Sequence, residues 1–238
     1  MGIFTNKDYN EFIANLSSVT ENGVNQFLPI EKGELEKKLV KLVRINVKKI
    51  KKDGVLYLAT KKTKATPTAY PFFVNEYALP FEDLKPPNAK NITKGRCNLE
   101  KELFWYLADS PKTATLEARI PVGSSFTIFK FKTDKLPKII DLTEWKDIVH
   151  SKNIDERILS LICSYFQTPF YFNKSVYDVC VYFINIFKSF GFKGVAWRSS
   201  WQKGNCIVLF EGSPGPFIES NRYILNSFNP ETAPPMDF

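Results

Sequence analysis

Two apolar helices followed directly by two short strands, in the last third of the chain, constrain the fold more than any other feature. Apolar residues recur at helical spacing over 154–166 and 176–190, and Gly191 ends the second run. Residues 195–199 and 206–210 have the composition of buried strands. Because helices and strands are mixed here without regular alternation, the pattern predicts an α+β fold.

The rest of the chain continues this mixture. We expect further helices at 9–16, 35–43 and 113–119. Ser110 should cap the last of these, with Pro111 at its first position. Alternating apolar residues predict strands at 42–48, 55–59, 102–108, 126–132 and 139–142. Prolines make 66–98 mostly irregular, and the tail after Gly212 is expected to be a surface wrap or a loose end.

Composition excludes several classes of protein and of site. The 238 residues are 44% apolar and include 21 Phe, which is enough for a large and bulky core. The four cysteines form no Cys-x-x-Cys pair and His150 is the only histidine, so neither a zinc site nor histidine-based catalysis is expected. No signal peptide or membrane span is predicted, and a cytoplasmic protein with reduced thiols is the expectation.

The net charge of +8 is concentrated in one stretch, residues 31–64. Such a patch binds phosphate groups, whether they belong to a nucleic acid or to a small metabolite. A solvated, lysine-rich helix face is the commoner explanation. Tyr57 is the only aromatic residue in the stretch, and base stacking needs more, so the sequence argues against nucleic-acid binding there.

Three segments resemble one known family. The first has Pro-Pro-Asn-Ala at 86–89 and Gly-Arg-Cys-Asn at 95–98, and the second is Tyr-Leu-Ala-Asp-Ser-Pro-Lys-Thr-Ala at 106–114, followed by Glu117. The third is Gly-Phe-Lys-Gly-Val-Ala-Trp-Arg-Ser-Ser at 191–200, followed by Gly-Asn at 204–205 and Val-Leu-Phe at 208–210. Together they resemble the RES-domain family, the toxins of Xre–RES toxin–antitoxin pairs.

The resemblance implies both a fold and an activity. It implies an ADP-ribosyltransferase-like mixed sheet core with flanking helices, and one RES-like domain over 1–238. The RES core would span 41–212, between an N-terminal extension at 1–40 and a C-terminal tail at 213–238. Members of the RES-domain family degrade NAD by hydrolysis or phosphorolysis, and some of them ADP-ribosylate a protein. The implied partners are therefore NAD, inorganic phosphate as an acceptor and a cognate antitoxin, with no metal and no membrane. The oligomeric state is left open.

The resemblance also implies a set of site residues. Glu117 matches the helix glutamate and Ser199 the serine after the late strand, and both are expected to be catalytic. The residues expected to bind NAD are Arg44, Arg96, Tyr106 and Asn205. The chain departs from the family at one place, since Cys180 and Val181 stand where many relatives have Thr-Gln.

The chemistry of these side chains agrees with that assignment. Cleavage of the nicotinamide–ribose bond develops an oxocarbenium-like cation, which a carboxylate such as Glu117 stabilises. The leaving group is already a pyridinium, so no general acid is needed. Arginines such as Arg44 and Arg96 suit a pyrophosphate better than lysines do. Tyr106 is expected to stack on the nicotinamide or the ribose, and Ser199 to donate a hydrogen bond to either group.

Each residue also has an ordinary alternative. Without the motifs, Glu117 is an ordinary surface carboxylate, Arg96 a loop cation and Tyr106 a core aromatic; the resemblance favours the functional assignment, although Ser200 competes with Ser199. Three functions therefore stay open. The first is an NAD glycohydrolase or phosphorylase, the second an ADP-ribosyltransferase acting on a macromolecule, and the third a module that binds nucleic acid or an acidic partner through 31–64.

Overall fold

The structure is a computed structural model. It describes residues 2–23, 33–45, 54–60, 63–67, 74–84, 92, 94–133, 137–143, 151–168, 175–201 and 203–225. Within these ranges the α-helices are α1 (Asn6–Asn22), α2 (Glu34–Ile45), α3 (Pro111–Glu117), α4 (Ile154–Gln167) and α5 (Ser175–Ser189), with a 3-10 turn, η2 (Phe81–Asp83). The strands are β1 (Val55–Thr60), β2 (Thr63–Pro67), β3 (Val74–Ala78), β4 (Trp105–Ala108), β5 (Ser125–Lys132), β6 (Ile139–Leu142), β7 (Gly194–Arg198), β8 (Asn205–Leu209) and β9 (Phe217–Ile224).

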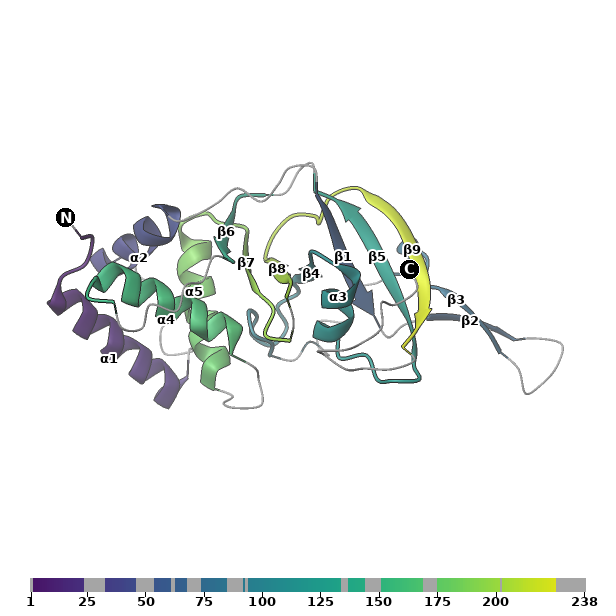
Figure 1. Cartoon of the computed structure of the whole chain (residues 1–238), viewed down its shortest axis with the longest axis horizontal. Coiled ribbons are helices and arrows are strands. Elements are labelled where there is room, and N and C mark those ends of the chain that lie inside the picture. Colours follow the sequence, from purple (N-terminus) through teal and green to yellow (C-terminus); the bar gives the residue numbers. More distant parts are fainter. Residues whose placement is uncertain are drawn as a thin grey trace.

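Seven of the strands form one mixed sheet in the order β6-β7-β8-β4-β1-β5-β9. The pair β6–β7 is parallel and every other pair in the sheet is antiparallel. The strands β2 and β3 form a separate hairpin, which projects as an arm from the β9 end of the sheet (Figure 1). The predicted α+β class is therefore confirmed.

Most predicted elements are present, and two predictions were wrong. Helix α2 continues through Ile45, so the strand expected from residue 42 does not begin there, and residues 46–48 lie outside the described ranges. The stretch 66–98, expected to be mostly irregular, contains the short elements β3 and η2. The tail after Gly212 contains β9, which pairs with β5 along most of its length. Its side chains are largely exposed, and the sequence therefore lacks a core pattern there.

Successive side chains along each strand point to opposite sides, which gives the sheet two distinct faces. One face, which we call the helix face, carries the side chains of Ala59, Val195, Trp197 and Val208. Helices α4 and α5 pack on this face at the β7 end, and α3 packs on it near β1. The opposite face carries Leu56, Phe131, Leu209 and other apolar residues, and the segment from Leu79 to Leu84 covers it.

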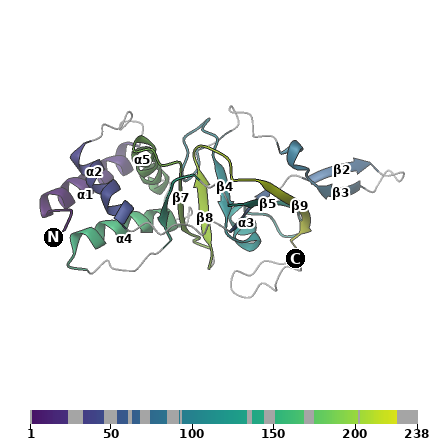
Figure 2. The ribbon, with the colours of Figure 1, turned by 90° about the horizontal axis from the view of Figure 1, so that it is seen from above.

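Helices α1, α2, α4 and α5 together form a helical layer at one end of the molecule, visible in both ribbon views (Figures 1 and 2). Its interior is aromatic: Phe183 lies 6.2 Å from Phe12 and 6.4 Å from Phe166, measured between ring centroids. All three side chains are fully buried. The expectation of a bulky core is thus confirmed, and α1 from the N-terminal extension is an integral part of that core.

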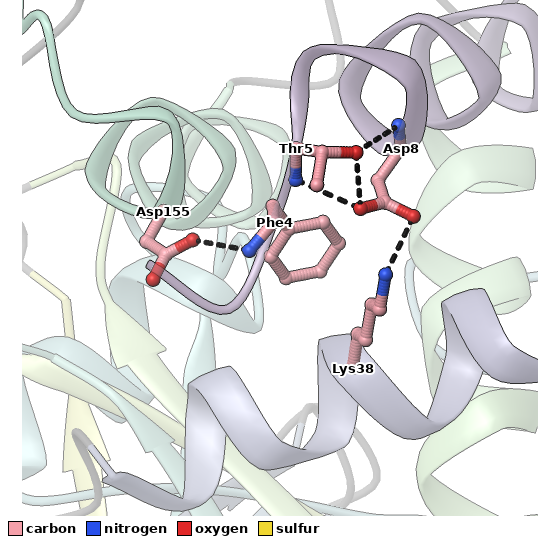
Figure 3. Close-up of polar contacts among 5 residues, drawn as sticks. All are labelled: Phe4, Thr5, Asp8, Lys38 and Asp155. Carbon is pink, nitrogen blue, oxygen red and sulfur yellow. Dashed lines mark hydrogen bonds and ion pairs between the residues drawn. The ribbon is translucent and has the colours of Figure 1, made fainter. Parts of the chain in front are cut away.

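The start of the chain is fixed by a network of polar contacts (Figure 3). Thr5 caps α1 in a capping box, in which Asp8 accepts from the Thr5 backbone N–H at 2.8 Å and Thr5 Oγ1 accepts from the Asp8 N–H at 3.3 Å. Asp8 also pairs with Lys38 of α2 at 2.7 Å, and Asp155 of α4 accepts from the Phe4 N–H at 2.9 Å. These contacts join the first residues of the chain and α1 to α2 and α4. No helix among the described residues is long and apolar enough to cross a membrane.

Candidate active site

A cavity of about 390 Å³ opens on the helix face of the sheet, between the helical layer and α3. Its volume lies in the range of small-molecule sites. The lining residues come from segments far apart in sequence. Pairing of β4 with β8 brings residues near position 106 beside residues near position 206. The polar and aromatic side chains that line it are Lys94, Arg96, Tyr106, Glu117, Arg119, Tyr177, Trp197, Trp201 and Cys206.

Glu117 reaches the cavity because α3 is short and firmly capped. Ser110 accepts a hydrogen bond from the Thr113 N–H at 3.1 Å, and Pro111 begins the helix, as the sequence predicted. Glu117 is the last residue of the helix and the one carboxylate among the residues that line the cavity. Thr113 is fully buried, and its hydroxyl pairs with that of Ser110 at 2.7 Å. Thr113 therefore supports the helix rather than the cavity.

Two side chains of the β7–β8 hairpin hold the Glu117 carboxylate. Ser199 Oγ donates to Glu117 Oε1 at 2.7 Å, and Cys206 Sγ lies 3.1 Å from the same oxygen. Ser199 Oγ in turn accepts from the Trp201 N–H at 3.1 Å, which fixes the direction of its proton. Ser199, rather than the neighbouring Ser200, is thus the serine that the fold brings to Glu117. It orients the carboxylate and does not line the cavity.

Cys206 remains a proton donor at the site. Burial, and after it the adjacent Glu117 carboxylate, raises the pKa of the Cys206 thiol well above its usual value. A protonated thiol is the form that donates to a carboxylate. Both bonds to Glu117 reach Oε1, so Oε2 is the oxygen that the described residues leave for a ligand.

The hairpin loop is positioned by close packing against α3. A Cβ on Gly204 would lie only 2.1 Å from Thr113 Oγ1, so only glycine fits there. Asn205 follows, and its side chain donates to Asp109 at 2.7 Å while its N–H donates to the same carboxylate at 2.9 Å. Asn205 therefore ties the loop to the start of α3, and it is not among the residues that line the cavity.

Tyr106 presents its ring to the cavity and anchors its hydroxyl in the protein. The residue is 40% exposed, yet its hydroxyl donates to Asn98 Oδ1 at 2.7 Å and accepts from the Cys97 N–H at 3.1 Å. Burial of the hydroxyl raises the pKa of Tyr106 well above its usual value, which keeps it protonated. A Cβ on Gly95 would lie 2.9 Å from this hydroxyl, so a glycine is required beside it.

Arg96 lines the cavity, but its guanidinium is held by the end of α4. It donates to the carbonyls of Tyr165, Phe166 and Thr168, with distances of 3.2 Å to the first and 2.8 Å to the last. These carbonyls belong to the last turn of the helix, where a cation is favoured. The Arg96 guanidinium also lies 5.6 Å from the centre of the Tyr177 ring. The structure thus gives Arg96 a structural role at the edge of the cavity.

The structure does not test the expectation for Arg44. This residue belongs to α2, and its side chain lies outside the described part of the chain. His150 is also outside it. Cys180 and Val181 are fully buried in α5, where Cys180 contacts the Tyr165 carbonyl at 3.4 Å.

Six of the polar and aromatic lining residues were not expected at the site: Lys94, Arg119, Tyr177, Trp197, Trp201 and Cys206. Arg119 and Trp201 each lie two residues beyond an expected site residue, which was the one available signal. Burial raises the pKa of Tyr177, while Arg96 and Arg119, the latter also through a side-chain hydrogen bond, act in the opposite direction. Arg96 and Arg119 therefore both interact electrostatically with Tyr177 at the cavity.

The described residues contain no group of three or more His, Cys, Asp or Glu side chains arranged to hold a metal ion. The four cysteines are all free thiols. Comparisons of the chain with protein-family models, with curated proteins and with solved structures gave no match. The interpretation of the cavity therefore rests on its own geometry and on the sequence motifs.

Proposed function

We propose that this chain consumes NAD+ by cleaving the N-glycosidic bond between nicotinamide and ribose, with water or phosphate as the acceptor. The observation that carries the proposal is the Glu117 carboxylate, held by Ser199 Oγ at 2.7 Å inside a cavity of about 390 Å³. The two residues lie 82 positions apart in sequence, and both were expected at the site from the RES-like motifs.

The geometry is suited to a cation-like transition state. The bond from the nicotinamide nitrogen to the ribose C1′ breaks, and nicotinamide leaves with the bonding electron pair. Positive charge then develops on the ribose, and Oε2 of Glu117 would stabilise it. An oxygen of water or phosphate bonds to C1′ and releases its proton to solvent. A hydroxyl and a thiol that hold Oε1 keep the carboxylate oriented without neutralising it.

The lining of the cavity supports a substrate with an aromatic ring and negative charge. Tyr106, Tyr177 and Trp201 offer ring surfaces for the nicotinamide or the ribose. Among the described residues that line the cavity, three are cations and one is a carboxylate; with Asp178 paired to Lys94, a positive balance remains that favours an anion. A nicotinamide dinucleotide has both features.

The domain family, the cellular location and the protein partner belong to the same proposal. The chain would be one RES-like domain with an ADP-ribosyltransferase-like sheet, would act in the cytoplasm, and would be neutralised by an antitoxin protein. The packing of α1 into the helical layer is consistent with one domain. The nucleic-acid alternative is the weaker one, because Tyr57 is the only aromatic residue in the basic stretch and base stacking needs more.

The test is nicotinamide release from NAD+ by the purified chain and by Glu117→Gln, which keeps the size of the side chain and removes its charge. We expect Glu117→Gln to lower kcat by two or more orders of magnitude. Glu100→Gln is the matched control, since Glu100 is an exposed carboxylate outside the cavity lining, and its rate should be unchanged. No release from the folded wild type, or equal release from both glutamate variants, would reject the proposal.

A second activity on the same site is favoured by the β2–β3 arm. This hairpin projects away from the sheet in both ribbon views (Figures 1 and 2) and would give a macromolecule a surface to dock on. The chain would then transfer ADP-ribose to that partner instead of to water. Incubation with NAD+ and a cell extract, followed by mass spectrometry, separates the two. A protein that gains ADP-ribose supports the transferase, whereas free ADP-ribose alone supports hydrolysis.

A further inference from the structure

Tyr106 is oriented the opposite way from most tyrosines near a protein surface. A tyrosine usually buries its ring and turns its hydroxyl toward water. Here the residue lines the cavity and is 40% exposed, whereas its hydroxyl points into the protein and donates to Asn98 Oδ1 at 2.7 Å. An exposed ring forgoes the burial that stabilises a fold. The orientation is therefore suited to contact between the ring and a ligand.

Asn98 is the buried side chain that accepts the Tyr106 proton. It is 4% exposed, and its Nδ2 donates to the Leu99 carbonyl at 2.8 Å, which leaves Oδ1 facing the tyrosine hydroxyl. The Asn98 carbonyl accepts from the Gly95 N–H at 3.1 Å, and the Cys97 N–H donates to the Tyr106 hydroxyl at 3.1 Å. The loop thus folds around this one hydroxyl.

Close packing of the same loop leaves the pair little freedom to move. A Cβ on Gly95 would lie 2.9 Å from the Tyr106 hydroxyl and still closer to Asn98 Oδ1. Moving either polar group away would leave its partner buried with a lost hydrogen bond, which is costly. The loop therefore determines where the hydroxyl lies and how the ring is angled, and Asn98 supplies the side-chain contact.

We propose that Asn98 is a positioning residue: through the Tyr106 hydroxyl it holds the ring in place to stack on the nicotinamide ring of the substrate. A ring already held in one rotamer loses no side-chain freedom when a ligand binds, and such preorganisation raises affinity. Asn98 acts from outside the site, since it is not among the residues that line the cavity. The inference rests on the proposed function for the identity of the ligand.

The test compares two ligands that differ in the nicotinamide ring. Carbocyclic NAD+ carries nicotinamide and resists cleavage, because a carbon replaces the ring oxygen of the ribose that would stabilise the cation. ADP-ribose lacks nicotinamide. Calorimetry would measure the affinity of both ligands for the wild type, Asn98→Ala, Tyr106→Phe and the double variant.

Thr127→Val is the matched control for loss of a buried hydrogen bond. Thr127 is fully buried, its Oγ1 accepts from the Leu79 N–H at 2.9 Å, and it is not among the residues that line the cavity. Thr127→Val and Asn98→Ala should both lower Tm, by about 2–8 °C, because each leaves a buried donor without its acceptor. Only the second should change the affinity for a ligand.

We expect Asn98→Ala to weaken binding of carbocyclic NAD+ about tenfold and to leave that of ADP-ribose within about twofold. Tyr106→Phe keeps the ring and should show the same selective loss. The double variant should lose no more than either single variant, because both remove the same bond. In turnover, Asn98→Ala should raise KM for NAD+ about tenfold with kcat changed by less than about threefold.

Four results would overturn the inference: a wild type that does not bind carbocyclic NAD+, unchanged affinity in Asn98→Ala, additive losses in the double variant, or an equal loss for both ligands. The last would assign Asn98 to the stability of the loop alone. A wild type that binds carbocyclic NAD+ but releases no nicotinamide from NAD+ would reject the proposed function alone. A selective loss in Asn98→Ala would then still support the inference.

Discussion

The helical layer and the cavity lie on the same face of one sheet, yet they are held together in different ways. In the helical layer, fully buried rings such as Phe183 and Phe166 make many weak contacts, and no single polar bond determines their positions. At the cavity, Glu117 and Tyr106 are each fixed by two specific hydrogen bonds. Stability is therefore concentrated in one region and precise orientation in the other, and variants should separate the two.

The largest loss of stability is expected from a deletion inside the helical layer. Phe183→Ala removes a ring that packs against those of Phe12, Phe166 and Phe187, and we expect it to lower the free energy of unfolding by about 3–5 kcal/mol. Urea denaturation followed by circular dichroism measures this. Val122→Ala, at an exposed side chain, should change it by less than about 0.5 kcal/mol. A cost below 1 kcal/mol for Phe183→Ala would contradict the contrast between the regions.

A substitution at the junction of loop and helix should affect both stability and the site. The Cβ of Gly204→Ala would meet Thr113 Oγ1 at 2.1 Å, and Thr113 is too deeply buried to move freely. We expect a loss of about 1–3 kcal/mol and a fall of about tenfold or more in nicotinamide release, since Ser199 shifts with the loop. Gly2→Ala is the control, because its Cβ would make only an ordinary contact of 3.6 Å. Equal stability in the two variants would refute the tight packing described for the loop.

A substitution among the polar bonds of the site should affect function more than stability. Ser199→Ala removes one donor to Glu117, and we expect a loss of about 1 kcal/mol in stability. The kcat for nicotinamide release should fall about 10- to 100-fold, because the carboxylate loses its orientation. Ser200→Ala, one residue further on, is the matched control and should retain the wild-type rate. If the two serine variants behave alike, Ser199 does not position Glu117.

The smallest effect is expected where the helical layer does depend on polar contacts, at the start of α1. The hydrogen bond from Lys38, followed by those from Thr5, lowers the pKa of Asp8 from 3.8 to about 2. The stabilisation is therefore complete above pH 4 and is lost as the pH falls toward 2. Asp8→Asn should lower stability at pH 7 by about 0.5 kcal/mol, with solvent screening taken into account, and should have a smaller effect at pH 2.

Urea denaturation of both proteins at pH 7 and pH 2 measures this difference. A gap between wild type and Asp8→Asn that stays constant with pH would show that the Asp8 carboxylate contributes nothing through its charge.

Sequence reasoning succeeded where local signals determine structure. The cap at Ser110, the period of α5 and the stop at Gly191 were all readable, because each acts within a few residues. It failed for β9, whose exposed side chains follow no core pattern, and for the end of α2, where the helix overrides a strand-like alternation.

The candidate site could be predicted only in part. The motifs singled out Glu117 and Ser199, which the structure brings together. They did not show that Arg96 is held by the carbonyls of α4, or that Asn205 turns away to Asp109. Such contacts join segments about 70 and 96 residues apart, and they depend on the strand order, which local patterns do not encode.

The position of β8 between β7 and β4 has a consequence for the newly made chain on the ribosome. Until residues 205–209 have emerged, β4 presents an open edge to its surroundings, and Glu117 has neither Ser199 nor Cys206 beside it in a formed hairpin. Glu117 therefore gains both of its hydrogen-bond donors only after the β7–β8 hairpin has been made, and an incomplete chain exposes β4 to mispairing before the site is complete.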